Sequence, residues 1–219
     1  MSDKEREADD QAAIPAITLG KAMGLLGFQA IGMIAIGTWL WDWSGREAER
    51  FVSLSAPEVL QGFALGLGLI ALAFAIFRGL PRLSETLVRM QAETYAFLGP
   101  KLGMPAIVFI SLCAGVGEEA LFRGGLQTLL GDELGAPLAI LLSSAVFAAI
   151  HLGKPVITAL LLVVGAIFGV VYWLTGSLLA VMIGHTLYDI WALRYLHREF
   201  VRLGLVGDEP ALANPADAV

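Results

Sequence analysis

The sequence has little of what a water-soluble domain contains. Charged residues make up 16% of its 219 positions, against about 25% in typical soluble domains, while hydrophobic residues make up 57%. The single cysteine, Cys113, excludes an internal disulfide, and we interpret it as a packing residue of an apolar helix. The His-Glu-x-x-His motif of soluble zinc proteases is absent. Together these features predict an integral membrane protein.

The charge distribution gives no sign of a nucleic-acid partner. The net charge is −6, much of the acid lies towards the two ends, and no stretch gathers Lys and Arg into a basic face. Residues 1–13 are polar and charged, which is typical of a disordered tail. They do not resemble a signal peptide, because their flank is acidic and the apolar run that follows is too long. We therefore expect the lipid bilayer, and no nucleic acid, around this chain.

The apolar stretches predict an all-α fold, a polytopic membrane bundle of about six transmembrane helices. They cover residues 17–41, 59–77, 105–130, 137–152, 156–174 and 178–193. A helix of about 20 apolar residues crosses the hydrocarbon core, so most of these stretches are long enough to span it. The stretch 137–152 is short, and its recessed end predicts a cavity that is open to the cytoplasm.

Residues 78–104 differ from these spans. Leucines recur there at helical spacing with charged residues between them. This pattern is typical of an amphipathic helix at the membrane interface, although a plain connecting helix fits it equally well. We divide the chain into an N-terminal tail (1–13), two spans with the interfacial helix (14–99), a core of four spans (100–195) and a cytoplasmic tail (196–219).

The basic residues predict the orientation. Lys and Arg are concentrated in the cytoplasmic segments of membrane proteins. With six spans and the N-terminus inside, only Arg46 and Arg50 fall in outside segments. The inside segments hold Lys4, Arg6, Lys21, Arg78, Arg82, Arg89, Lys101, Lys154, Arg194, Arg198 and Arg202. We therefore expect a multi-pass protein of the cell (inner) membrane with both termini in the cytoplasm.

Ionisable residues interrupt the third apolar stretch. Glu118, Glu119 and Arg123 lie in a run that is otherwise apolar over residues 105–130. Each charge is costly at such a depth unless it finds a partner. Glu119 and Arg123 are four residues apart and can pair on one helix face. Glu118 points about 100° away, so we predict that it faces a cavity and takes a proton from water.

Two histidines lie at compatible depths. The third and fourth stretches form a hairpin with its turn near Leu134, which brings His151 to a depth similar to that of Glu118. His185 lies in the sixth stretch, within reach of both, and Asp189 follows it by four residues on the same face. A carboxylate in that position can orient an imidazole or join it in binding a metal. The predicted cluster contains Glu118, Glu119, His151, His185 and Asp189.

These motifs resemble a known family. Glu-Glu-x-x-x-Arg (118–123), Phe-x-x-x-His (147–151) and His-x-x-x-Asp (185–189) follow in this order on successive spans. This order resembles the CPBP family, which includes type II CAAX prenyl endopeptidases and bacteriocin-processing or bacteriocin-immunity membrane proteins. The resemblance covers residues 100–195. It implies an endopeptidase that hydrolyses a membrane-anchored peptide or protein, with Glu118 as the residue that activates water.

The resemblance leaves the chemistry of the histidines open. It implies that His151 and His185 bind a metal or stabilise an oxyanion. With Glu118 they can form a three-ligand Zn²⁺ site that has one open position, or Glu118 can act without a metal. Prenyl endopeptidases carry asparagine at the position of Asp189. An ionised aspartate cannot donate a hydrogen bond to an oxyanion, so we expect Asp189 beside a histidine or a metal.

Two other functions are compatible with the sequence. A non-catalytic immunity or scaffold protein could keep the same fold and bind a peptide or membrane partner. A transporter could use the same buried charges, but the two halves of the chain show no inverted repeat.

Overall fold

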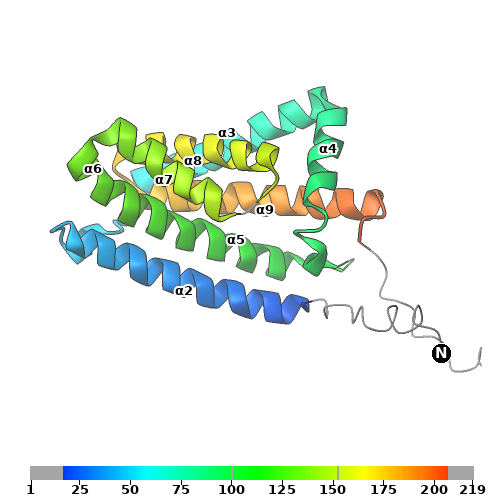
Figure 1. Cartoon of the computed structure of the whole chain (residues 1–219), viewed down its shortest axis with the longest axis horizontal. Helices are drawn as coiled ribbons and strands as arrows, with labels where there is room; N and C mark the ends of the chain where they lie inside the picture. Colours follow the sequence, from blue (N-terminus) through cyan, green and yellow to red (C-terminus); the bar gives the residue numbers. More distant parts are fainter. Residues whose placement is uncertain (1–16, 100, 152, 207–219) are drawn as a thin grey trace, which may run out of the picture.

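The fold is entirely helical over the part of the chain that can be described. The structure is a computed structural model that describes residues 17–99, 101–151 and 153–206 (Figure 1). Every regular element within these ranges is a helix, which confirms the all-α prediction. The predicted tail 1–13, and the part of the predicted C-terminal tail from residue 207 onward, lie outside the described residues.

The helices follow one another with short connections. They are α2 (Leu19–Trp43), α3 (Ala56–Gly79), α4 (Pro81–Gln91), α5 (Met104–Glu119), α6 (Thr128–Leu134), α7 (Ala136–Ile150), α8 (Pro155–Thr175) and α9 (Leu178–Arg202). A π-helix, η3 (Ala120–Gln127), joins α5 directly to α6. Short 3₁₀ turns occur at η1 (Ala48–Arg50) and η2 (Ala96–Leu98). Several helices begin where the sequence provides a cap, since the hydroxyls of Thr18, Ser55 and Ser177 each accept a hydrogen bond from a first-turn amide.

Four helical stretches among the described residues are long and apolar enough to cross a membrane. They are α2, α3, the continuous stretch Met104–Leu134 and α8. Helix α7 is apolar but has 15 residues, and α9 has 25 residues with a more polar composition. The six-span count therefore stays a prediction. Helix α9 also continues to Arg202, past residue 193 where we placed the end of the last span.

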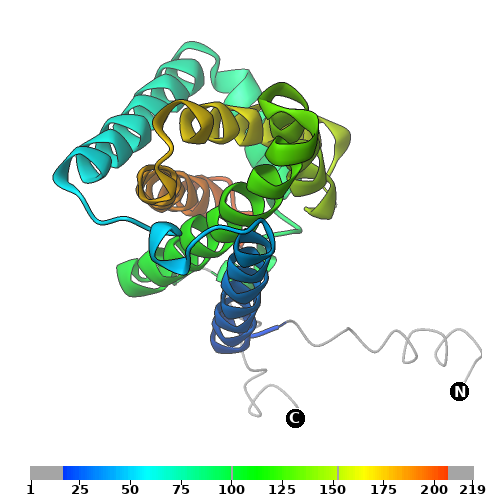
Figure 2. The ribbon, with the colours of Figure 1, turned by 90° about the vertical axis from the view of Figure 1, so that its left-hand side faces the viewer.

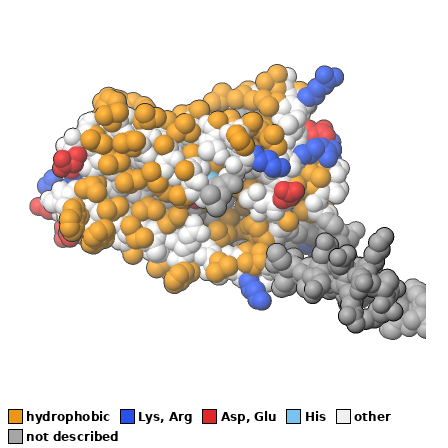
Figure 3. Space-filling view, viewed as in Figure 1, with side chains coloured by type: hydrophobic (Ala, Val, Ile, Leu, Met, Phe, Trp, Pro, Cys, Tyr) orange, Lys and Arg blue, Asp and Glu red, His pale blue; other side chains and the backbone are white. Residues whose placement is uncertain are grey.

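The arrangement of side chains on the surface suits a bilayer. Hydrophobic side chains cover the middle of the face in Figure 3, and charged side chains gather towards its two ends. Large exposed apolar residues occur along α2, α3, α7 and α8. A surface of this kind is unfavourable in water and favourable in hydrocarbon. The chain is a multi-pass membrane protein.

Helix α9 is the central element of the bundle. In the end-on view of Figure 2 it is surrounded by α3, α5 and α8, and it contacts each of them. Helix α2 lies on the outside of the bundle, along α5 and η3. The segments that carry the three sequence motifs, α5–η3, α7 and α9, are therefore grouped together.

The regular helix in the predicted amphipathic segment is shorter than expected. Only residues 81–91 form a regular helix, α4, because the backbone breaks at Leu80 before Pro81. Leu87 is buried, whereas Leu80 and Leu83 are exposed. The Ser84 hydroxyl shares a hydrogen bond of 2.7 Å with a tyrosine hydroxyl of α9. Helix α4 is thus attached to the bundle by one edge, and its place at the membrane interface stays a prediction.

Helix α2 approaches the acidic segment very closely. A Cβ atom on Gly37 would overlap the carbonyl group of Ala120 and lie 2.9 Å from the amide nitrogen of Leu121. Further along the same contact, a Cβ atom on Gly117 would lie 3.0 Å from the Cα atom of Ala30. The two backbones meet because these positions have no side chain. This contact fixes α2 beside the helix turn that carries the glutamates.

We expect Gly37→Ala to destabilise the protein by about 1–3 kcal/mol, because the added methyl group overpacks the α2–η3 contact. This loss should exceed the gain of about 1 kcal/mol in helix propensity. Denaturant unfolding of the purified protein in detergent measures the difference. Gly24→Ala on the same helix is the matched control, since its Cβ atom would meet nothing within 4 Å. Equal stability of the two variants would refute the close approach.

Candidate active site

A π-helix carries the first motif. The chain passes from α5 into η3 at Ala120 without a break, and the wider turns of η3 include Arg123. The Thr128 hydroxyl donates a hydrogen bond of 2.9 Å to the Arg123 carbonyl. Such π segments are rare and occur frequently at functional sites. We did not predict it, although Gly124-Gly125 is a pair of poor helix formers in this stretch and could have signalled an irregular turn.

Glu119 is completely buried and has two cationic or donor partners. Its Oε1 atom accepts a hydrogen bond from Arg123 Nη1 at 3.1 Å and lies 2.8 Å from His185 Nδ1. The side chains of Glu119 and Arg123 are both 0% exposed. The predicted pairing of Glu119 with Arg123 is therefore present. Its contact with His185 joins the end of α5 to α9; the predicted cluster contained both residues but did not specify this direct contact.

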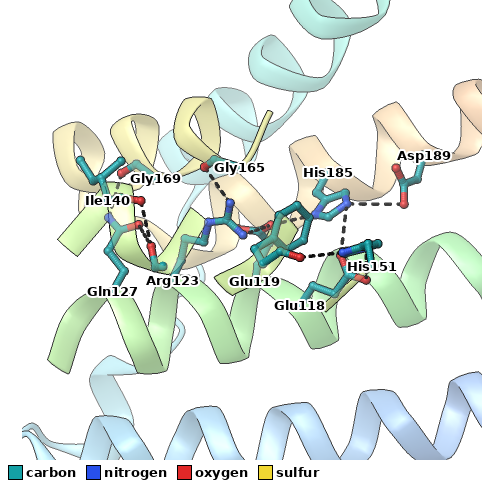
Figure 4. A network of polar contacts seen from close by, with 12 residues as sticks. Glu118, Glu119, Arg123, Gln127, Ile140, His151, Gly165, Gly169, His185 and Asp189 are labelled. Carbon is teal, nitrogen blue, oxygen red and sulfur yellow. Dashed lines mark hydrogen bonds and ion pairs between the residues drawn. The ribbon is translucent and has the colours of Figure 1, made fainter. Parts of the chain in front are cut away.

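Arg123 connects this pair to α8. Its Nη2 atom donates a hydrogen bond of 2.7 Å to the Gly165 carbonyl (Figure 4). The guanidinium also lies over the rings of Phe147 and Phe168, at 5.0 and 5.6 Å from their centroids. Contacts of this kind stabilise a buried cation. Arg123 is thus held by α7, α8 and Glu119 at once.

Gln127 extends the same set of contacts by one turn. Its Nε2 atom donates a hydrogen bond of 2.9 Å to the Gly169 carbonyl, in parallel with the Arg123–Gly165 contact (Figure 4). A Cβ atom on Gly169 would lie 2.8 Å from the Gln127 side chain, so the glycine makes room for it. Sequence reasoning missed Gln127. The sequence does contain a pattern that could have indicated it. Gln127 follows Arg123 by four residues, and Gly169 follows Gly165 by four residues, so the two pairs can meet at the same spacing along two helices.

Glu118 points away from this buried network and towards the histidines. Its carboxylate oxygens lie 3.8 Å from His151 Nε2 and 3.8 Å from His185 Nε2. His185 Nε2 is also 3.5 Å from the Asp189 carboxylate. Figure 4 shows these side chains converging from α5, α7 and α9. The structure thus brings together all the members of the predicted cluster, while their chemical roles stay predictions.

Both imidazoles are oriented by their Nδ1 atoms. His151 Nδ1 lies 2.7 Å from the Phe147 carbonyl, which can only accept, so this nitrogen donates. The His185 Nδ1 atom faces Glu119 in the same way. Aromatic rings cover one side of each imidazole, Phe147 at 4.7 Å from His151 and Phe168 at 4.8 Å from His185. As a result both Nε2 atoms are presented to Glu118.

The site opens into a cavity of about 610 Å³. Glu118, His151, His185 and Asp189 line this cavity, whereas Glu119 and Arg123 lie behind it. Cys113, which we interpreted as a packing residue, is half-buried and also lines it. The cavity gives Glu118 room for water and for a substrate, and its opening to the cytoplasm, expected from the short fourth stretch, stays a prediction.

The ligand types suit zinc, but their spacing does not. Imidazole nitrogens and carboxylate oxygens both bind Zn²⁺ at about 2.0 Å, which places neighbouring tetrahedral ligands about 3.3 Å apart. The Glu118 oxygens are 3.8 Å from each Nε2 atom. Within the described ranges, no three His, Cys, Asp or Glu side chains form a group that could hold a metal ion. A Zn²⁺ site of His151, His185 and Glu118 stays a prediction from the family resemblance.

We expect Arg123→Met to destabilise the protein by about 3–5 kcal/mol, because it leaves the buried Glu119 carboxylate without its cation. Arg89→Met is the matched control. Arg89 also pairs with a glutamate four residues before it, at 2.8 Å, but both side chains are largely exposed, and such a pair contributes about 0.3–0.5 kcal/mol. Unfolding in detergent measures both losses. Losses of similar size would show that the Glu119–Arg123 pair does not act as a buried ion pair.

The comparison with known proteins agrees with the three motifs. Residues 100–191 match the family model of the type II CAAX prenyl endopeptidase Rce1-like proteins. The uncharacterized protein YpbD of Bacillus subtilis (strain 168) is 33% identical over 92 residues, which are 41% of this chain and 44% of YpbD. The match thus spans less than half the length of this relative. No solved structure gives a significant match. The matched segment contains the glutamate pair and both histidines, and residues 100–191 of this chain are therefore similar to the Rce1-like family.

Proposed function

We propose that this protein is an intramembrane endopeptidase that hydrolyses a peptide bond of a membrane-associated protein or peptide by means of a water molecule activated by Glu118. The observation that carries this proposal is that the two adjacent glutamates have different surroundings. Glu119 is buried and occupied by Arg123 and His185, whereas Glu118 faces both the cavity and two Nε2 atoms. The match of residues 100–191 to a family of endopeptidases supports the same class of reaction.

Glu118 acts first as a base and then as an acid. Its carboxylate takes a proton from water while the water oxygen forms a bond to the carbonyl carbon of the substrate. The electron pair of the carbonyl double bond moves to the carbonyl oxygen, which becomes an oxyanion. The electron pair of the oxyanion then re-forms the carbonyl double bond, the carbon–nitrogen bond breaks with its electron pair going to nitrogen, and Glu118 returns the proton to that nitrogen. The products are a carboxyl group and an amine, and no covalent enzyme intermediate forms.

In this mechanism His185 stabilises the oxyanion. Each of its ring nitrogens faces a carboxylate, Nδ1 towards Glu119 and Nε2 towards Asp189. A ring with an acceptor at each nitrogen is best matched when both nitrogens carry a proton. The Nε2–H group can then turn its hydrogen bond towards negative charge that develops on the substrate. Asp189, which has no donor of its own when ionised, orients this ring.

Arg123 and Glu119 position the reacting groups without touching the substrate. Arg123 fixes Glu119, and Glu119 fixes His185, through the buried contacts already given. His151 holds its ring by the Phe147 carbonyl and faces Glu118 from the other side. Because the spacing of these side chains does not fit Zn²⁺, the steps above involve only groups of this chain.

We expect Glu118→Gln to lower peptide cleavage by a factor of about 10²–10⁴, the usual contribution of a general base. The substitution keeps the shape of the side chain and removes its basicity. The measurement is mass-spectrometric detection of cleavage in a pool of membrane-anchored peptides, with full-length protein in detergent. Glu133→Gln is the control, since Glu133 is exposed in the α6–α7 hairpin, far along the chain from the cluster, and its cleavage rate should equal that of the wild type.

The outcomes separate the rival functions. Equal cleavage by the wild type and Glu118→Gln would contradict the proposed role of Glu118. Cleavage by neither would favour the non-catalytic immunity or scaffold protein. A parallel sample with a zinc chelator tests the metal. If the chelator abolishes cleavage and added Zn²⁺ restores it, the side chains of the site must move closer together around a metal ion.

A further inference from the structure

One face of helix α2 forms a wall of the cavity. Its cavity-lining residues are Leu26, Gln29, Ala30 and Met33. This spacing of three, four and seven residues is that of a single helix face. Neighbouring side chains such as Phe28 and Ile31 lie on the other side and are 78% and 68% exposed, as expected of residues that face lipid. Helix α2 precedes the segment 100–191 that matches the family, so this wall is a feature of the chain outside the match.

Gln29 is the polar member of this face. The hydroxyl of Thr38, another polar side chain of α2, is satisfied by its own helix because it donates to the Ile34 carbonyl at 2.8 Å. Gln29 makes no side-chain hydrogen bond within the part of the chain that the structure describes. An amide without a partner in an apolar medium costs roughly 2–7 kcal/mol. Gln29 is itself exposed, and because lipid offers no hydrogen-bond partner, the cavity that it lines is the environment that can satisfy its side chain.

The contact between α2 and α5 places Gln29 next to the reacting carboxylate. Ala30 faces Gly117, where a Cβ atom would lie 3.0 Å from the Ala30 Cα atom. Gln29 comes directly before Ala30, and Glu118 comes directly after Gly117. Both side chains line the same cavity. A group bound by Gln29 is consequently held on the Glu118 side of the cavity.

The cavity wall formed by α8 has no counterpart of Gln29. It consists of Ile157, Leu160, Leu161 and Val164, which share one helix face and include no polar side chain. A peptide in this cavity can place apolar side chains against α8, but its main-chain N–H and C=O groups need polar partners. A glutamine amide has both a donor and an acceptor, and so matches a peptide group.

We propose that Gln29 is a substrate-binding residue: its side-chain amide hydrogen-bonds to a main-chain peptide group of the substrate and holds an extended, apolar peptide segment beside Glu118. This inference rests on the proposed peptidase function. It also assigns a role to α2, which becomes part of the substrate site.

The test measures binding separately from cleavage. The probe is a fluorescent peptide that the wild type cleaves, bound to full-length Glu118→Gln protein in detergent. Adding Gln29→Leu should weaken binding of this peptide about three- to tenfold, the range expected for one hydrogen bond. In the background with Glu118 intact, Gln29→Leu should raise KM by a similar factor and change kcat less than about threefold. Thr38→Val removes a polar group from the same helix away from the cavity, and should change neither.

Backbone-ester analogues of the peptide distinguish a direct contact from a structural effect. Each analogue replaces one peptide N–H by an ester oxygen. At one position the ester should weaken binding to the Gln29 protein and have no further effect in Gln29→Leu, because the same hydrogen bond is already lost.

Two results would overturn the inference while the peptidase stands. They are unchanged binding in Gln29→Leu, and ester effects that simply add to those of Gln29→Leu at every position. If the wild type cleaves no peptide, or Glu118→Gln cleaves as well as the wild type, the proposed function fails and the inference fails with it.

Discussion

The Oε1 atom of Glu119 is the point on which the site depends. It accepts a hydrogen bond from Arg123 Nη1 at 3.1 Å and lies 2.8 Å from His185 Nδ1. It thereby connects Arg123 on η3 to His185 on α9. Arg123 continues the connection to α8 through the Gly165 carbonyl. Removing one member of such a buried set leaves the others charged or polar and unpaired, at a cost of several kcal/mol. This constraint fixes the turn of the helix, and it is why the adjacent Glu118 is presented to the cavity.

A buried ionic network of this kind is a costly way to hold helices together. Apolar residues of similar volume stabilise a core equally well or better, and charged groups inside a membrane are usually functional. Here the network orients an imidazole and a second carboxylate at a water-accessible cavity. Helix α2 completes that cavity from outside the family segment, held there by backbone contact at Gly37 and Gly117. The network thus costs free energy of burial, but it holds the reacting groups in a defined arrangement.

The sequence predicted those parts of the site that follow from helical spacing. The four-residue spacing of Glu119 and Arg123 gave their pairing, and counting from the turn near Leu134 gave the common depth of Glu118 and His151. It did not predict η3, in which Gly125 packs so closely on α2 that a Cβ atom there would lie 2.9 Å from the Gly37 Cα atom. Nor did it predict the hydrogen bonds of Arg123 and Gln127 to α8, because their acceptors are backbone carbonyls that any residue carries. The short length of α4 and the extension of α9 to Arg202 depend on a backbone break at Leu80 and on packing, neither of which periodicity records.

The most direct test is a double-mutant cycle between Glu119 and His185. The free energy of unfolding is measured in detergent for the wild type, Glu119→Gln, His185→Gln and the double variant of the full chain. If Glu119 organises the site through His185, the two losses are not additive and the coupling energy is about 1–3 kcal/mol. Additive losses would show that the two side chains lie near each other without depending on each other, and would contradict this account of how the site is built.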